Sequence, residues 1–250
     1  MNISEPGLLL FLVAGLAALL VGLSKAGLSM AGALGTPVLA MVNSPVKAAA
    51  LLLPIFVVSA WFGLYAYRRE FDSRNLKILI PAGVAGIGIG WLSFAVVPDH
   101  IVGLLIGVIG VTFCLNAWRI RNHPPVARPA DVPRGLFWGT IAGFTSFISH
   151  SGGPPYQVYV LPQRLSKSVF AGTTTITFAA INLVKLLPYW QLGQLDLANL
   201  KFSLLLMPIA VAGTFIGVWL VRVIPERTYF LLVHVALFLL SSKLVVDAIS

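Results

Sequence analysis

A lysine between glycines and serines interrupts the first long apolar run of the sequence. The segment 22–29 reads GLSKAGLS and places Lys25 after Ser24 and shortly before Gly27 and Ser29. A lysine at mid-membrane costs about 2.5–3.5 kcal/mol on insertion scales, so it normally marks a partner, a wet cavity or a ligand. Glycine lets the helix unwind, and the next helix then points its unpaired N–H groups and positive dipole end toward the gap. This combination predicts a binding site for an anion.

A second apolar run breaks in a similar way in the other half of the chain. The segment 144–155 reads FTSFISHSGGPP, and its Gly-Gly and Pro-Pro pairs cannot continue a helix without losing backbone hydrogen bonds. The serine hydroxyls either satisfy the freed backbone groups or donate to an oxyanion, and the histidine adds charge when protonated or shuttles a proton. A lone histidine is more often structural. The candidates selected here are Ser149, His150, Ser151, Gly152, Gly153 and Gln157.

Lys25 also has a simpler interpretation, in which it ends the first helix and extends its ammonium to the membrane interface. The apolar run 28–42 follows it, which places Lys25 inside a helical hairpin and favours the anion site.

The threonines 173–175 and Asn182 are secondary candidates, although threonines in membrane helices usually bond back to their own backbone. Lys185 precedes Pro188 and is expected near the interface.

The elements that position these residues are apolar helices. Of the 250 residues, 58% are hydrophobic and 10% are charged, against about 25% charged in soluble domains. Such a chain needs lipid as its solvent, so we expect an all-α membrane protein. A crossing takes roughly 20 apolar residues, and we expect about eight transmembrane helices plus two re-entrant or broken segments. The helices are expected at 8–23, 46–67, 76–97, 101–118, 135–149, 169–188, 202–221 and 228–246, and the short segments at 28–42 and 155–161.

The polar segment RIRNHPPVARPADVPR at 119–134 splits the chain in two. We predict a first transmembrane repeat at 1–122, a cytoplasmic linker at 123–133 and a second repeat at 134–250. Residues that match at a nearly constant offset support the repeat: Pro81, Gly86 and Gly90 match Pro208, Gly213 and Gly217. With about four crossings per half, the two repeats are expected to be parallel, related by an axis along the membrane normal.

The basic residues indicate how the chain is oriented. The loops 68–77 and 119–134 are rich in arginine and share a side, which the positive-inside rule places in the cytoplasm. On this topology the basic residues at 164–167 and 222–227 fall on the outer side. The net charge of +9 lies in short loops, which favours a membrane surface over nucleic acid as the partner.

Several classes of function find no support in the sequence. There is no G-x-x-x-x-G-K-[ST] motif for ATP, and the single cysteine, Cys114, excludes an internal disulfide or a cysteine-based metal cluster. Acidic residues such as Asp72 and Asp99 stand almost only in loop positions, which argues against a carboxylate-lined cation site. We therefore expect neither an enzyme nor a bound cofactor.

At these residues the chain resembles the TauE/SafE sulfite exporter family of anion permeases. The resemblance rests on GLSKAGL at 22–28, Gly-Thr-Pro at 35–37, Asn-Ser-Pro at 43–45 and Ser-Gly-Gly-Pro at 151–154, and it covers nearly the whole chain. It implies a multi-pass permease of the bacterial inner membrane, with two homologous halves, that exports sulfite, sulfoacetate or another small organosulfur anion.

From the residues and the resemblance together, we expect a secondary transporter of a small sulfur-containing anion, with membrane lipid as its other partner and no role for nucleic acid. Self-association is left open. Two alternatives remain: a passive anion channel that uses the same two breaks, and a non-transporting membrane subunit of a larger complex.

Overall fold

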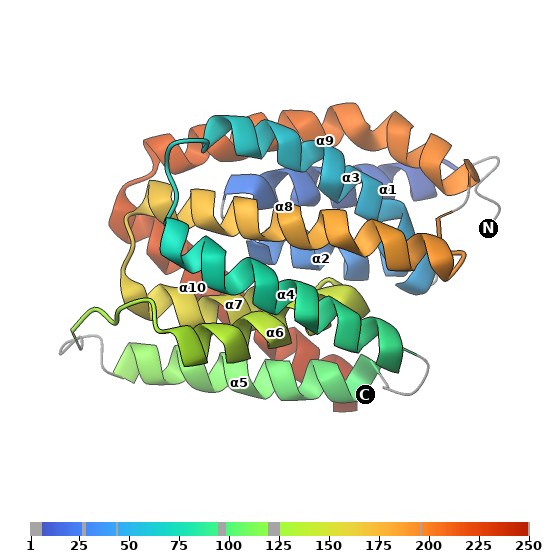
Figure 1. Cartoon of the computed structure of the whole chain (residues 1–250). Helices are drawn as coiled ribbons and strands as arrows, with labels where there is room; N and C mark the ends of the chain where they lie inside the picture. The colour runs from blue at the N-terminus through green and yellow to red at the C-terminus, as the bar shows by residue number, and fades with distance from the viewer. Residues whose placement is uncertain are drawn as a thin grey trace.

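The computed structural model describes residues 7–26, 29–43, 45–94, 99–119, 126–195 and 197–249, and all regular structure within these ranges is helical (Figure 1). The expected all-α class is thereby confirmed. The elements in chain order are α1 (Leu8–Leu23), η1 (Ser24–Ala26), α2 (Ser29–Ala40), α3 (Pro45–Ala66), α4 (Ser73–Ser93), α5 (Asp99–Arg119), α6 (Val132–Ser149), α7 (Gly153–Val160), η2 (Leu161–Gln163), α8 (Lys167–Gln191), α9 (Leu197–Val223) and α10 (Glu226–Ile249).

Among the described residues, five helices are long and apolar enough to cross a membrane: α3, α4, α8, α9 and α10. Helix α1 and the described apolar parts of α2 and α5 are shorter. Many of the large side chains on the outer surface are leucine, valine, isoleucine, phenylalanine or tryptophan, as expected of a protein surrounded by lipid. The chain is therefore a multi-pass membrane protein, and the count of eight crossings stays a prediction.

Each of the two sequence breaks reverses the direction of the chain. Helix α1 ends at Leu23, the short turn η1 follows, and α2 returns beside α1 (Figure 1). The second half contains the same reversal. Helix α6 ends at Ser149, His150 to Gly152 form the break, and α7 then runs back in the opposite direction. The two short apolar segments are thus the returning arms of two broken helical hairpins.

These reversals correct the predicted orientation of the two halves. The prediction of parallel repeats assumed four crossings in each half, whereas α2 and α7 each add one more reversal. Helices α4 and α9, which carry the matched Pro81 and Pro208, consequently run in opposite directions (Figure 1). Any correspondence between the halves must therefore be inverted rather than parallel.

Because consecutive helices alternate in direction, four connections lie at one end of the bundle: α3 to α4, α5 to α6, α7 to α8, and α9 to α10 (Figure 1). Hydrogen bonds join them. Asn75 and Gln163 exchange two amide bonds of 2.8 and 3.1 Å, and Lys167 Nζ donates to the carbonyl of Ile224 at 2.6 Å. The expectation that residues 164–167 and 222–227 lie opposite the first two loops is therefore wrong.

We call this region the basic end. Its lysines and arginines in the described ranges are Arg68, Arg69, Arg74, Lys77, Arg119, Arg128, Arg134, Arg164, Lys167, Arg222 and Arg227. At the opposite end lie Lys47, Lys201 and Lys243, and of the lysines and arginines that the structure describes only Lys25 and Lys185 are buried in the interior. The corrected topology thus gives a much stronger charge asymmetry than the predicted one.

Each half holds the broken hairpin of the other half. Helix α4 packs along α6, and α9 packs along α1, at backbone-to-backbone crossings. A Cβ added to Gly86 of α4 would lie 2.0 Å from the carbonyl oxygen of Thr140, and one added to Gly22 of α1 would lie 2.1 Å from that of Ala210. Only glycine permits this approach, so these crossings fix where the two breaks lie.

Candidate functional site

The two breaks line one buried cavity of about 30 Å³, at the middle of the long helices α3 and α8. Phe56 lies midway along α3, and Thr174 to Asn182 lie in the middle of α8. Every polar lining residue is less than a tenth exposed. These residues are Ser24 and Lys25 from the first break, Ser146 and His150 from the second, and Thr174, Thr175 and Asn182 from α8.

Lys25 is 2% exposed and lines this cavity. Its ammonium lies 4.9 Å from the centroid of the Phe56 ring, a cation–π contact, and it has no hydrogen-bond acceptor or carboxylate partner within the described ranges. Its backbone is held by α8, because Thr175 Oγ1 donates to the Lys25 carbonyl at 2.7 Å. The first break therefore presents a fixed backbone and a buried lysine that has no counter-ion among the described residues.

The second break begins where α6 ends. His150 has a left-handed backbone, with φ of 55°, and the amide of Ser151 donates to the carbonyl of Thr145 at 3.2 Å. This is the pattern in which helices commonly end at glycine, and a residue with a Cβ there costs of order 1 kcal/mol. The His150 ring stacks on Phe56 at 5.0 Å between centroids, and its Nε2 lies 3.3 Å from the carbonyl oxygen of Ala49.

Lys185 lies beside the cavity, contrary to the expectation that it sits at the membrane interface. It is fully buried, and its Nζ donates to the Ser146 carbonyl at 2.6 Å, to His150 Nδ1 at 2.8 Å and to Asn182 Oδ1 at 3.3 Å. The expectation failed because α8 continues through Pro188 to Gln191, which moves Lys185 inward. The sequence did carry a signal for this position of Lys185, since residues 175, 178, 182 and 185 are spaced to lie on one face of a helix.

Of the predicted site residues, Lys25, Ser24, His150 and Gly153 line the cavity. The hydroxyl of Ser24 already forms a hydrogen bond within the chain, since it donates to the Val21 carbonyl at 2.6 Å. Gly153 is followed by Pro154 and Pro155, which have no N–H group, so only its own amide remains as a donor among these three residues.

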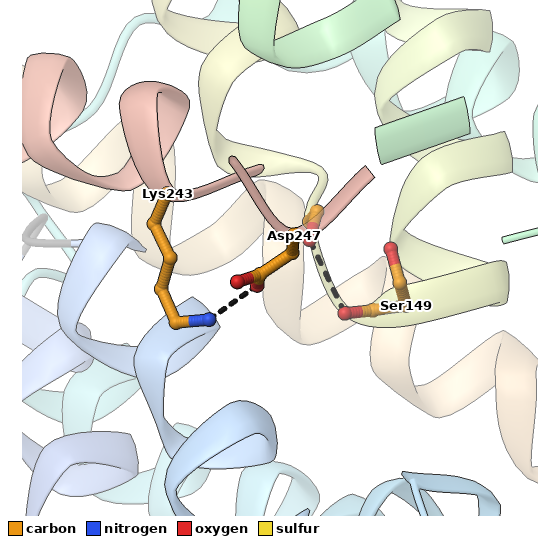
Figure 2. A network of polar contacts seen from close by, with 4 residues as sticks. Ser149, Lys243 and Asp247 are labelled. Carbon is orange, nitrogen blue, oxygen red and sulfur yellow. Dashed lines mark hydrogen bonds and ion pairs between the residues drawn. The ribbon is translucent and has the colours of Figure 1, made fainter. Parts of the chain in front are cut away.

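The other predicted residues lie away from the cavity lining. Ser149 (Figure 2) is half-buried; its hydroxyl donates to the Thr145 carbonyl at 3.4 Å, and Ser151 Oγ donates to the Ser149 carbonyl at 3.3 Å. Gly152 packs on α6, where an added Cβ would lie 2.5 Å from the Ala142 carbonyl oxygen. Gln157 is buried in α7 outside the lining.

Two predicted residues belong to the first break. Gly27 lies outside the described residues. Ser29 begins α2, and its side chain is likewise outside what the structure describes.

The threonines of α8 divide into two groups. Thr173 and Thr174 donate to the carbonyls of Val169 and Phe170, each at 2.7 Å, as expected for threonine in a membrane helix. Thr175 instead bonds to the first break, as described above. It therefore links α8 to the backbone that carries Lys25.

No Asp or Glu of the described residues lines the cavity. Within the described ranges, the one ion pair joins Lys243 and Asp247 in the last turns of α10 (Figure 2), and no group of three His, Cys, Asp or Glu side chains could hold a metal ion. The cavity wall therefore combines positive charge with neutral donors, an arrangement suited to an anion and not to a cation.

The family model described as Sulfite exporter TauE/SafE matches residues 10–244, nearly the whole chain. The comparison with curated proteins and the comparison with solved structures gave no match. The matched residues include both broken hairpins and the helices that enclose the cavity. The chain belongs to the TauE/SafE sulfite exporter family.

Proposed function

We propose that the protein is a secondary transporter that binds a small sulfur oxyanion, such as sulfite, at Lys25 and carries it across the bacterial inner membrane. Family membership supports a membrane transporter. The observation that carries the rest is the ammonium of Lys25, which is 2% exposed, lines a cavity at the middle of the long helices and has no counter-ion in the described part of the chain.

Charge supports an anionic occupant. A buried ammonium without a partner is costly, and an oxyanion in the cavity would offset this cost through a charge-assisted hydrogen bond. Further donors are the amide of Gly153 and the side-chain amide of Asn182, both at the cavity wall. The hydroxyls of Ser24 and Thr175 already donate to backbone carbonyls, so in this state they contribute less to binding.

Size supports a compact occupant. The cavity volume of about 30 Å³ is room for about two water molecules, since one needs roughly 10–15 Å³ measured in this way. Sulfite, with one sulfur and three oxygens, demands a smaller expansion than sulfoacetate or another organosulfonate. Sulfite is therefore the substrate that we propose first.

The burial of the cavity lining supports a carrier. Because its polar lining residues are all less than a tenth exposed, we propose that helices move when an anion enters or leaves. Since α4 packs along α6 and α9 along α1, we propose that each half moves with the broken hairpin of the other. The basic end would face the cytoplasm by the positive-inside rule.

The proposal is tested by the flux of radiolabelled sulfite into liposomes that contain the purified protein. The variant Lys25→Met removes the ammonium and keeps most of the side-chain volume. Loss of a charge-assisted hydrogen bond, worth about 1.5–3 kcal/mol, should lower the initial rate at subsaturating sulfite by about tenfold or more. Lys243→Met is the matched control, because it removes a lysine that is paired with Asp247 outside the cavity.

The outcomes separate the alternatives. A saturable flux that falls in Lys25→Met and persists in Lys243→Met supports the carrier. A flux that rises linearly with sulfite and depends on Lys25 indicates a channel. Equal flux in all three proteins removes Lys25 from the site, and no flux of any anion favours a non-transporting subunit.

A further inference from the structure

Behind the cavity wall lies a second buried lysine that the proposed function has not used. Lys185 is fully buried, and its three partners, Ser146, His150 and Asn182, all line the cavity. The ammonium of Lys25 lies 4.9 Å from the centroid of the Phe56 ring, on which the His150 ring stacks. The two lysines therefore lie beside one aromatic pair, Lys25 next to Phe56 and Lys185 next to His150.

The groups around Lys185 carry no full negative charge. Its ammonium donates to a carbonyl, to an imidazole nitrogen and to an amide oxygen. The carbonyl, that of Ser146, belongs to the last turn of α6, where the helix dipole supplies only a partial negative charge. The imidazole is neutral in this arrangement, because Nδ1 accepts from Lys185 and Nε2–H donates to the carbonyl of Ala49.

We propose that Lys25 and Lys185 together match the site to a doubly charged oxyanion, and that Lys185 also orients Asn182 as a donor. This inference rests on the proposed function and specifies its substrate class. A monoanion beside two buried ammonium groups leaves one positive charge uncompensated, whereas a dianion balances both.

Asn182 acquires its orientation from Lys185. Its Oδ1 accepts from the ammonium at 3.3 Å, which leaves its NH₂ group as a donor, and the residue lines the cavity. Lys185 is thus a positioning residue as well as a source of charge, and Lys25 is the cation that contacts the anion.

The test compares two inhibitors of similar shape and different charge. Methylphosphonate is a dianion at alkaline pH, and methanesulfonate is a monoanion at the same pH. Each is added to liposomes that contain the full chain while the uptake of radiolabelled sulfite is measured. We expect methylphosphonate to inhibit wild-type uptake at about tenfold lower concentration, the effect of one additional charge interaction in a partly screened site.

Two variants assign this preference to Lys185. Asn182→Asp preserves the shape of the side chain and its acceptor, and adds a carboxylate that neutralises Lys185. Lys185→Met removes the second charge. In each variant the ratio of the two inhibitory concentrations should fall to about one, whereas Lys243→Met should keep the wild-type ratio. A structural role of Lys185 alone would lower all fluxes together and leave this ratio unchanged.

Three results overturn the inference. Equal inhibition of wild-type uptake by the two anions shows that the site does not select a dianion, while sulfite flux itself still supports the proposed function. A preference that survives in Asn182→Asp, or in Lys185→Met, shows that Lys185 is not its source. Absence of sulfite flux in the wild type overturns the proposed function as well. If Lys185→Met fails to fold, Asn182→Asp alone decides.

Discussion

The ammonium nitrogen of Lys185 lies 2.8 Å from Nδ1 of His150, and this contact joins α8 to the point where α6 ends. One turn further along α8, Tyr189 donates its hydroxyl to the carbonyl of Phe147 at 3.0 Å. The last carbonyls of a helix have no partner within it. Two side chains of α8 therefore satisfy the end of α6 and keep the second break in position beside the cavity.

This capping predicts a measurable contribution from the hydroxyl of Tyr189. Tyr189→Phe removes only that group, and its ring remains packed against Phe147 at 5.5 Å between centroids. We expect the protein to lose about 1 kcal/mol of stability, because a buried carbonyl loses its donor. Thermal unfolding in detergent measures the effect. Tyr65→Phe, on an exposed tyrosine, is the control, and equal melting temperatures for the two variants would contradict the capping role.

The glycine crossings predict opposite effects for two substitutions in the same helix. Gly86→Ala would place a Cβ 2.0 Å from the Thr140 carbonyl oxygen, which forces α4 and α6 apart. We expect a loss of several kcal/mol, or failure to fold, because the obstruction is backbone. Gly88→Ala meets nothing within 4 Å and should stabilise α4 by about 0.5–1 kcal/mol. Unfolding curves that shift in the same direction would refute this account of the crossing.

The reciprocal amide pair at the basic end predicts coupling between Asn75 and Gln163. Each side chain is buried and bonds to the other, so removal of either leaves a buried amide without its partner. In a double-mutant cycle with Asn75→Ala and Gln163→Ala, we expect a coupling energy of about 1 kcal/mol or more. Additive losses of unfolding free energy would show that this contact does not hold the two halves together.

The left-handed backbone of His150 predicts a difference between two truncations. His150→Gly and His150→Ala both remove the ring, but glycine adopts a φ of 55° without strain. The glycine variant should therefore be the more stable by about 1 kcal/mol. Their melting temperatures, compared under identical conditions, provide the measurement. A more stable alanine variant would mean that the break changes conformation when the ring is absent.

The positions of the helices and of the two breaks could be predicted from the sequence, because apolar runs and their interruptions are local signals. Each expected span overlaps one observed helix, and the two short runs correspond to α2 and α7. The number of helices that cross the bilayer could not be predicted from these local signals. A short apolar run between breaks has the same composition whether it crosses the membrane or returns partway.

The relation between the halves was mispredicted for that reason. One uncounted reversal in each half changes the parity, so Arg164 and Arg222 were expected on the wrong side. Contacts between distant segments fixed the correct arrangement, above all the bonds from Lys167 to the carbonyls of Arg222 and Ile224. No local pattern in the sequence reports such a contact.

Within the site, the sequence indicated Lys25 and His150 but not Lys185. Lysines near the end of an apolar run usually extend to the interface, and a nearby proline suggests that the helix is ending. Pro188 lies instead in the last turn of α8, where the helix continues to Gln191. The partners that hold Lys185 come mostly from a distant break, and only Asn182 was within reach of sequence reasoning.

The most direct test of the central claim is to locate the bound anion. A crystal structure of the protein soaked in selenite, an anomalously scattering relative of sulfite, would show its position by an anomalous difference peak. We predict a peak in the cavity within about 4 Å of Lys25 Nζ, the usual limit for such an ion pair, and none there in Lys25→Met. A peak confined to the basic end, with the cavity empty at saturating selenite, would contradict the account.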